Sequence, residues 1–265
     1  MRIKKFMAAL LIALSFNGCA VRSDKAVKEP VDEDPGLSST DQKVMSFSLA
    51  GYEKNGRKKW EVQGKSADIM SEVVNLTDVV AKAYGEEVDM TLTADKGVFN
   101  RNTSDAHFES NVVVSGTDGT KMTTDEADWK NNDQKIVTDK PVKLYAESKD
   151  ALGGGGEGKM PTTIVCDGPM EINYGKNYAT FSTNVRVDDE RGQIFCDTAT
   201  AYYDPGTKKV SRIVAKGNVK IVRGGSWTFS DEAVYFAAEQ KIILSGSPKV
   251  TVYPEESKAA TKEVF

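Results

Sequence analysis

Apolar and polar residues alternate along most of the chain with a period of two. Four segments show the pattern most plainly, at residues 142–144, 185–187, 219–221 and 250–252. In each segment two apolar side chains flank a middle residue, which is Lys143, Arg186, Lys220 or Thr251. A period of two sends successive side chains to opposite faces of a β-strand, so the pattern predicts strands with one buried face and one face in water. No strong helical periodicity follows residue 18, which favours an all-β fold.

The alternating segments belong to a longer repeat. Each copy has a small residue, an aromatic or apolar residue two positions later, a Lys-apolar pair or its equivalent, a short turn and a second strand. Copies start at residues 67, 97, 127, 172, 201 and 233. The spacing is about 30 residues except for one longer interval, which contains the glycine run at 153–158. Six two-strand units, with two further strands at 44–52 and 58–62, predict about fourteen antiparallel strands.

The first 40 residues have the composition of a targeting segment and a tether. Basic residues precede an apolar run at 6–16, which is shorter than the roughly 17–25 residues that a spanning helix needs, so residues 1–18 are predicted to be a signal peptide. The run stops at Cys19, in a context that resembles a bacterial lipobox although Phe16 and Asn17 depart from it. We therefore expect a lipid on Cys19 and a polar tether over 19–40. An ordinary signal peptide with an incidental cysteine and a short uncleaved anchor are the alternatives.

Charge and residue chemistry narrow the function class. The formal net charge is −4 and there is no basic stripe, which argues against a nucleic-acid partner. His107 is the only histidine and has no evident partners for a metal or a general base. The glycine run lacks the Lys-Ser/Thr ending of a phosphate-binding loop. We expect a protein that is not an enzyme and has no cofactor and no bound metal.

Two segments resemble a known family. Residues 51–69, GYEKNGRKKWEVQGKSADI, resemble the opening of the LptC-like component of the lipopolysaccharide-export periplasmic bridge. The later copies, with Ala-x-Tyr-Asp at 201–204 and Gly-Asn-Val at 217–219, resemble the OstA/LptA-like repeat of the bridge. The resemblance covers about residues 44–253. It implies an elongated open β-jelly-roll, a "β-taco", with an LptC-like roll over 41–148, a Gly-rich insertion over 149–161, an OstA-like roll over 162–253 and a flexible tail over 254–265.

The resemblance also implies a function. The roll would bind the acyl chains of lipopolysaccharide in its interior and pass them across the periplasm. Implied partners are lipopolysaccharide, the inner-membrane lipopolysaccharide ABC transporter, and other β-roll modules that pair through edge strands near residues 45–49 and 249–253. The anchor would hold the protein in the periplasm at a membrane, with the inner membrane favoured and the outer membrane open. The competing interpretation is a packed structural or adhesive β-repeat lipoprotein without lipid cargo.

The inward residues of the repeats are the expected lipid-binding lining. They are Phe99, Val112, Val114, Trp129, Val142, Leu144, Tyr174, Val185, Val187, Tyr203, Val219, Ile221, Tyr235, Val250 and Val252. Two arrangements are open for Cys166 and Cys196, which lie at similar phases of successive repeats. In a meander they would be about 9–10 Å apart, too far for a disulfide. If equivalent strands were neighbours, a disulfide would be feasible.

Overall fold

The computed structural model describes residues 41–53, 55–84, 89–148, 160–189, 192–207, 209–239 and 241–252. The signal peptide, Cys19, the tether and the tail over 254–265 lie outside these residues. The regular secondary structure of the described residues consists of strands alone. These residues therefore include no helix that could cross a membrane. The strands are β1 (Asp41–Tyr52), β2 (Lys58–Met70), β3 (Val73–Ala83), β4 (Met90–Asn100), β5 (Ala106–Gly116), β6 (Lys121–Lys130), β7 (Lys135–Thr138), β8 (Val142–Ser148), β9 (Met160–Cys166), β10 (Met170–Asn173), β11 (Tyr178–Asp189), β12 (Gly192–Tyr203), β13 (Val210–Arg223), β14 (Ser226–Phe236), β15 (Lys241–Ser245) and β16 (Lys249–Thr251).

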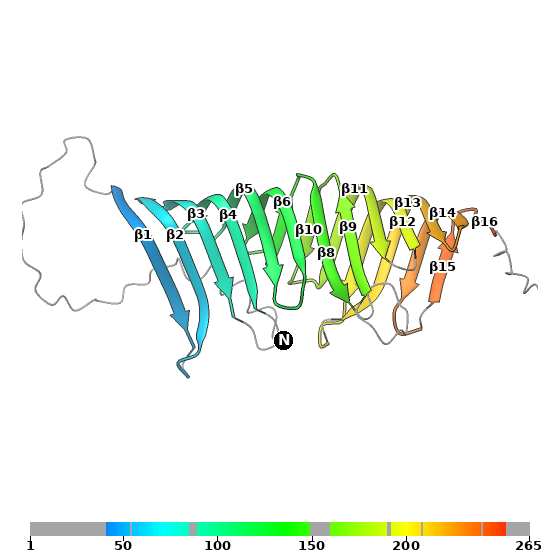
Figure 1. Cartoon of the computed structure of the whole chain (residues 1–265), viewed down its shortest axis with the longest axis horizontal. Helices are drawn as coiled ribbons and strands as arrows, with labels where there is room; N and C mark the ends of the chain where they lie inside the picture. The colour runs from blue at the N-terminus through cyan, green and yellow to red at the C-terminus, as the bar shows by residue number, and fades with distance from the viewer. Residues whose placement is uncertain are drawn as a thin grey trace, which may run out of the picture.

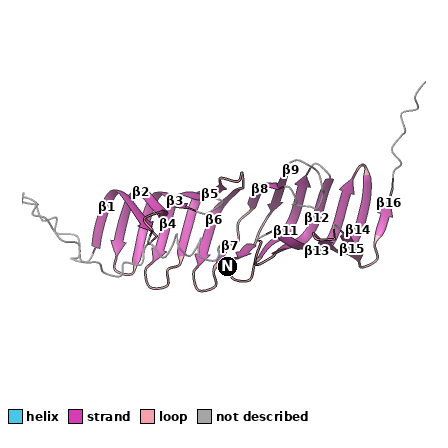
Figure 2. Ribbon diagram, turned by 90° about the horizontal axis from the view of Figure 1, so that it is seen from below, coloured by secondary structure: helices cyan, strands magenta, loops and turns pink. Residues whose placement is uncertain are grey.

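All sixteen strands belong to one antiparallel sheet, which confirms the predicted all-β class with two strands more than the expected fourteen. Strands follow one another along the long axis of the molecule, from β1 at one end to β15 and β16 at the other (Figures 1 and 2). The sheet continues across the glycine insertion, because β8 pairs with β9 from Val142↔Cys166 to Ser148↔Met160. Met160 and Pro161, expected to lie in the insertion, therefore begin β9. The two predicted rolls are one continuous sheet.

Most strands bend near their middle, and the recurring Asn-Val phrase marks the bend. Asn111, Asn184 and Asn218 have left-handed φ values of 53°, 52° and 49°. The ladder register shifts at each of them, as in a β-bulge, which bends a strand while its pairing continues on both sides. Asn tolerates this conformation better than other non-glycine residues.

The bend corrects one sequence prediction. The segment between the Lys-apolar pair and the V-x-I residues was expected to be a turn between two strands. In β13 it is a bulge inside one strand, because Gly217 and Asn218 supply two consecutive left-handed residues. Proline replaces the bulge in three places. Pro141, Pro169 and Pro248 separate β7 from β8, β10 from β9 and β15 from β16, since proline cannot donate to the ladder.

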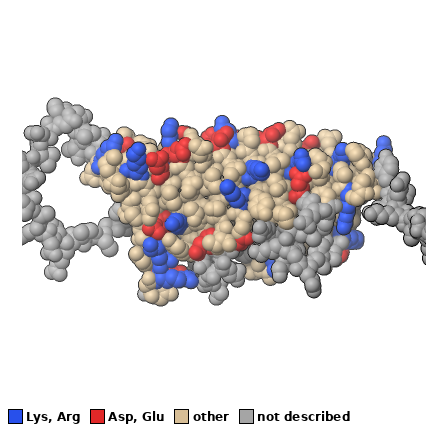
Figure 3. All heavy atoms as spheres, in the orientation of Figure 1, with Lys and Arg blue, Asp and Glu red and all other residues tan. Residues whose placement is uncertain are grey.

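The bend divides the sheet into two arms with a core between them. We call the residues at the bend the crease row: Phe47, Gly64, Val79, Ala94, Val112, Thr124, Val142, Cys166, Val185, Cys196, Val219 and Ser230. All of them except Gly64 are at most 9% exposed. Only Phe47 is large, because the two arms approach most closely at the crease. On the outside, charged side chains are scattered over the face turned to the reader in Figure 3, and uncharged residues cover most of it.

Candidate functional site

The interior between the arms is lined by further rows that run the length of the sheet. The first-arm row pairs strand by strand through Leu49, Val62, Ala81, Leu92, Val114, Met122, Leu144, Ile164, Val187, Ile194, Ile221, Thr228 and Val250. The second-arm row pairs through Gln42, Ile69, Val74, Phe99, Ala106, Trp129, Ile136, Ile172, Ala179, Ala201, Ile213, Tyr235 and Ile242. Apart from Gln42, Thr228 and the phenol of Tyr235, both rows are apolar. Such continuity follows from the period of two, which keeps each strand's apolar face in line with that of its neighbour.

The structure places most of the expected lining residues in this interior. Seven are buried members of the core cluster, five pack partly exposed against it, and Tyr235 is 8% exposed. The face assignment agrees with the expectation, because Val142 is buried whereas Lys143 is exposed, and Val185 and Val187 are buried whereas Arg186 is exposed.

The two C-terminal members of the expected lining are not buried. Val250 ends the first-arm row but is 60% exposed, and Val252 follows β16 and is 69% exposed. Both lie at the end of the sheet, where no further strand of the described residues covers them.

Depth separates the lining residues into two groups. Val112, Val142, Val185 and Val219 lie in the crease row and are at most 3% exposed, so a molecule between the arms would not reach them without displacing other side chains. The partly exposed residues stand further from the crease and are Val114, Leu144, Tyr174, Tyr203 and Ile221. These five are the accessible part of the predicted lining.

Aromatic side chains lie along the second arm, away from the crease. Trp129 is 2% exposed, and its ring centroid lies 6.3 Å from that of Tyr174. Burial raises the pKa of Tyr174, with Tyr203 as a second cause, and burial also raises the pKa of Tyr203. The Nε1 atom of Trp129 is buried without a hydrogen-bond partner among the described residues. The arm therefore presents an apolar lining with neutral polar groups.

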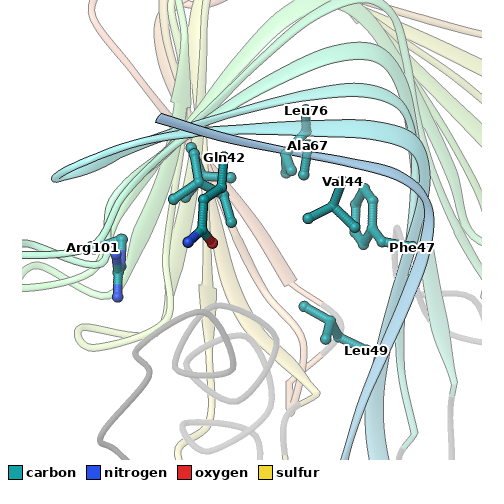
Figure 4. A pocket seen from close by; sticks show the side chains of 9 residues that line it. Gln42, Val44, Phe47, Leu49, Ala67, Leu76 and Arg101 are labelled. Carbon is teal, nitrogen blue, oxygen red and sulfur yellow. The ribbon is translucent and has the colours of Figure 1, made fainter. Parts of the chain in front are cut away.

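A cavity of about 330 Å³ opens the interior at the β1 end. Its volume is at the lower end of the range typical of small-molecule pockets. Figure 4 shows β1 curving around it, with Val44, Phe47 and Leu49 pointing into the concave side. Ala67, Ile69, Val74 and Leu76 complete an apolar wall, and Gln42 and Arg101 are the polar residues that line it.

Arg101 lies across the cavity from these β1 side chains (Figure 4). Its backbone N–H donates to the Glu72 carbonyl at 2.8 Å, and its guanidinium Nη1 donates to the Ser71 carbonyl at 3.1 Å. These bonds attach Arg101, the only cation among the described residues that line the cavity, to the β2–β3 hairpin. The cavity combines apolar walls with one fixed positive charge.

The cysteines are not joined by a disulfide. Cys166 and Cys196 are both free and buried. Strand β11 lies between β9 and β12, and Val185 pairs with Cys196 while the neighbouring Arg186 pairs with Val165. Two strand spacings, about 9–10 Å, therefore separate the strands that carry the two cysteines, as in the meander arrangement. Both cysteines belong to the crease row, where a small buried side chain fits.

His107 has acidic neighbours that the sequence did not show. Among the described residues, no group of three or more His, Cys, Asp and Glu side chains has the arrangement to hold a metal ion. His107 Nδ1 lies 3.0 Å from Asp128 Oδ1, and His107 Nε2 lies 3.0 Å from Glu109 Oε1. These contacts lie on the outer face of the second arm, away from the interior.

Several interior residues were not predicted. Leu49, Val62, Ile164 and Ile194 extend the first-arm row, and Phe108, Met170 and Phe181 are buried on the second arm. Ile164 and Ile194 stand two positions before Cys166 and Cys196, so the period of two could have identified them. The remaining residues needed the ladder register, because their segments do not repeat the V-x-I pattern.

Comparison with known proteins identifies the family. A family model described as "Lipopolysaccharide-assembly, LptC-related" matches residues 7–165, and one described as "LptA/(LptD N-terminal domain) LPS transport protein" matches residues 168–263. Among solved structures, one similar chain is LptH from Pseudomonas aeruginosa, "the LptA homologous periplasmic component of the conserved lipopolysaccharide transport device". It is 13% identical, with 62% of this chain and 95% of that chain covered and a TM-score of 0.32. None of the curated proteins matches the chain. Since the first family model spans more than half of the sequence, the protein belongs to the LptC-related family of lipopolysaccharide-assembly proteins, and its C-terminal part is of the LptA/LptD N-terminal type.

Proposed function

We propose that the protein binds the acyl chains of lipopolysaccharide between the two arms and passes them along the periplasmic export bridge, without chemistry of its own. The observation that carries the proposal is the continuity of the apolar first-arm and second-arm rows through one sheet. Burial of each methylene group contributes about 0.8 kcal/mol, so a lipid with several chains needs a long apolar surface to cross an aqueous compartment. The partly exposed residues Val114, Leu144 and Ile221 would contact the chains.

The cavity at the β1 end would be the place where an acyl chain first enters the interior. Its wall is apolar, and Arg101 lies where an anionic head group would remain in water while the tail is buried. A guanidinium binds phosphate oxygens in a bidentate manner, which suits the phosphates of lipopolysaccharide. The cavity would therefore orient the lipid with its tails toward the crease.

The ends of the sheet support docking to other bridge components. Val44 and Met45 on β1 are 40% and 60% exposed, and Ile242, Val250 and Val252 at the other end are 48%, 60% and 69% exposed. Edge strands that offer unpaired backbone groups and apolar side chains invite strand pairing, and a soluble monomer usually avoids them. The lipopolysaccharide ABC transporter and further β-roll modules are the partners that these edges would contact.

The proposal includes a membrane anchor. A lipid on Cys19 and a tether over 19–40 would hold the sheet in the periplasm beside a membrane. Mass spectrometry of the protein purified from membranes tests this, because acylation adds the mass of the lipid and cleavage before Cys19 removes residues 1–18. An unmodified Cys19 in the mature protein would contradict the anchor.

Site-specific photo-crosslinking tests the transport function. A photo-reactive amino acid at position 144 or 221, which face inward, should form adducts with lipopolysaccharide. Positions 113 and 123 face outward on β5 and β6, beside the inward Val114 and Met122, and as controls they should form few adducts. Equal yields on both faces, or none at 144 and 221, would contradict the proposal and favour a packed structural repeat without lipid cargo.

A further inference from the structure

The outer face of the first arm carries another row, made of cations and aromatic rings apart from Val165. Ladder partners connect Lys143, Val165, Arg186, Phe195, Lys220, Phe229 and Lys249, one from each of β8, β9, β11, β12, β13, β14 and β16. We call it the outer basic–aromatic row. Trp227 stands beside the row, two residues beyond Phe229 on β14 and further from the crease, and it pairs with Val222 and Thr251. The row spans the C-terminal half of the sheet and plays no part in the interior.

Two cations of this row, Lys220 and Arg186, stack on aromatic rings. The Lys220 ammonium lies 3.8 Å from the centroid of the Trp227 ring and 5.5 Å from that of Phe195. The Arg186 guanidinium lies 5.8 Å from the Phe195 ring. These distances are in the range of cation–π interactions, which hold the side chains flat against the sheet. The aromatic faces and the positive charges are thus presented together.

The charge of this row is largely uncompensated. Arg186 pairs with Asp188 at 2.7 Å, whereas no ion pair joins Lys143, Lys220 or Lys249 to a carboxylate in the part of the chain that the structure describes. Trp227 is 39% exposed and Phe229 is 43% exposed, with their ring centroids 6.4 Å apart.

Several cations on the outer face of the second arm have acidic partners instead, although Arg212 there stacks on the Tyr202 ring at 4.3 Å. Lys135 pairs with Glu171 at 3.2 Å and Lys140 with Glu126 at 3.3 Å. Lys216 pairs with Glu232 at 3.4 Å. The protein has a net charge of −4. The outer face of the first arm is nevertheless more positive than the outer face of the second arm, where most of these cations are paired with carboxylates.

We propose that the outer basic–aromatic row docks the protein on an anionic lipid bilayer surface. Lysines near such a surface are attracted to acidic head groups, each contributing roughly a factor of five to the contact equilibrium. Tryptophan favours the interface between head groups and acyl chains, where an exposed ring on a sheet face can lie. Because the rest of the protein is acidic, the same membrane repels the other faces and orients the sheet with the first arm toward the lipid. This contact is separate from the interior, and only its last member, Lys249 on β16, lies on an edge strand of the sheet.

Crosslinking in vesicles tests the docking on the full chain. The protein, reconstituted in vesicles of phosphatidylglycerol and phosphatidylcholine, carries a benzophenone amino acid at position 229 or, as a control, at position 98. Val98 is 38% exposed and lies on the outer face of the second arm, in register with His107. Any membrane anchor near the N-terminus is common to both samples. Lipid adducts at position 229 should exceed those at 98 severalfold, and should fall in pure phosphatidylcholine vesicles or at high salt.

The lysines supply a second measurement. Lys220→Gln with Lys249→Gln should weaken the contact at position 229 by roughly 25-fold, as two factors of five predict. Lys216→Gln, on the second arm, should leave it unchanged. Equal adduct yields at 229 and 98, or yields at 229 that do not depend on lipid charge, would overturn the proposal. So would adducts between two copies of the chain, or adducts formed only when lipopolysaccharide replaces phosphatidylglycerol. None of these results depends on the interior, so the proposed acyl-chain function is judged separately.

Discussion

Substitution of Asn218 tests whether the β-bulge at this residue bends strand β13. Asn218 has a φ of 49°, and its Nδ2 donates to Asp197 Oδ2 at 2.9 Å across the β12–β13 pair. Asn218→Ala removes the hydrogen bond and leaves an alanine in a left-handed conformation. The left-handed conformation costs about 1–2 kcal/mol, and a net hydrogen bond contributes about 0.5–1.5 kcal/mol, with the lower half expected because both groups are exposed. The free energy of unfolding should fall by about 2 kcal/mol.

Asn218→Gly separates the two contributions. Glycine adopts the left-handed conformation without strain, so this variant loses only the hydrogen bond and gains flexibility in the unfolded chain, at a cost of about 1 kcal/mol or less. In a domain of this size, 1 kcal/mol shifts the melting temperature by about 2–4 °C. Thermal unfolding followed by circular dichroism should therefore show a decrease of about 4–8 °C for alanine and roughly half of that or less for glycine.

Asn132 is the control position for this measurement. Asn132 lies in the β6–β7 turn without a left-handed φ, so Asn132→Ala should change stability by no more than about 0.5 kcal/mol. The same experiment at Asn111, whose Nδ2 donates to Asp95 at 2.7 Å, should reproduce the order of Ala below Gly. If alanine and glycine are equally destabilising at Asn218, or if Asn218→Ala behaves like the control, the bulge is not held by this residue and the account of the bend is wrong.

Three further predictions concern His107, Trp129 and the two buried cysteines. Partial burial opposes a charge on His107, but hydrogen bonds to Glu109 and Asp128 outweigh it and raise the pKa of His107. The stabilisation is therefore complete below the unfolded pKa of about 6.5 and is lost as pH rises through the folded pKa, so His107→Gln should lower the melting temperature more at pH 5.5 than at pH 9, and an equal decrease at both would contradict this. Trp129→Ala, at a side chain 2% exposed, should cost about 3–5 kcal/mol in urea unfolding, whereas a cost below about 1 kcal/mol would mean that the interior is loosely packed there. Burial raises the pKa of Cys196 to about 11 and also raises that of Cys166, so both thiols should react slowly with a thiol reagent in the native protein at pH 8. Both should be alkylated after unfolding without reductant, and a disulfide-linked peptide in the mass spectrum would contradict the structure.

Much of the architecture could be predicted from the sequence, because the periodicity of a strand depends only on residues that are neighbours in the chain. Lys143 between Val142 and Leu144 assigns the buried face without any tertiary information, and the six copies of the unit indicate a long antiparallel sheet. The same reasoning placed most of the expected lining residues on the inward face. It failed for Val250 and Val252, because burial depends on whether a further strand covers the residue and not on parity.

Sequence alone determined that this protein is a repeated β-structure with one continuous apolar face, since alternation at period two admits few other folds. Only the tertiary structure decided that the Asn-Val phrase is a bend within a strand, because the bulge is held by contacts between residues as far apart as Asp197 and Asn218. It also decided that Cys166 and Cys196 stay apart, and that cations and rings from strands β8 to β16 form one row on the outer face. Each of these depends on which strands are neighbours and in what register, and ladder register is a property of pairs of segments that no single segment encodes.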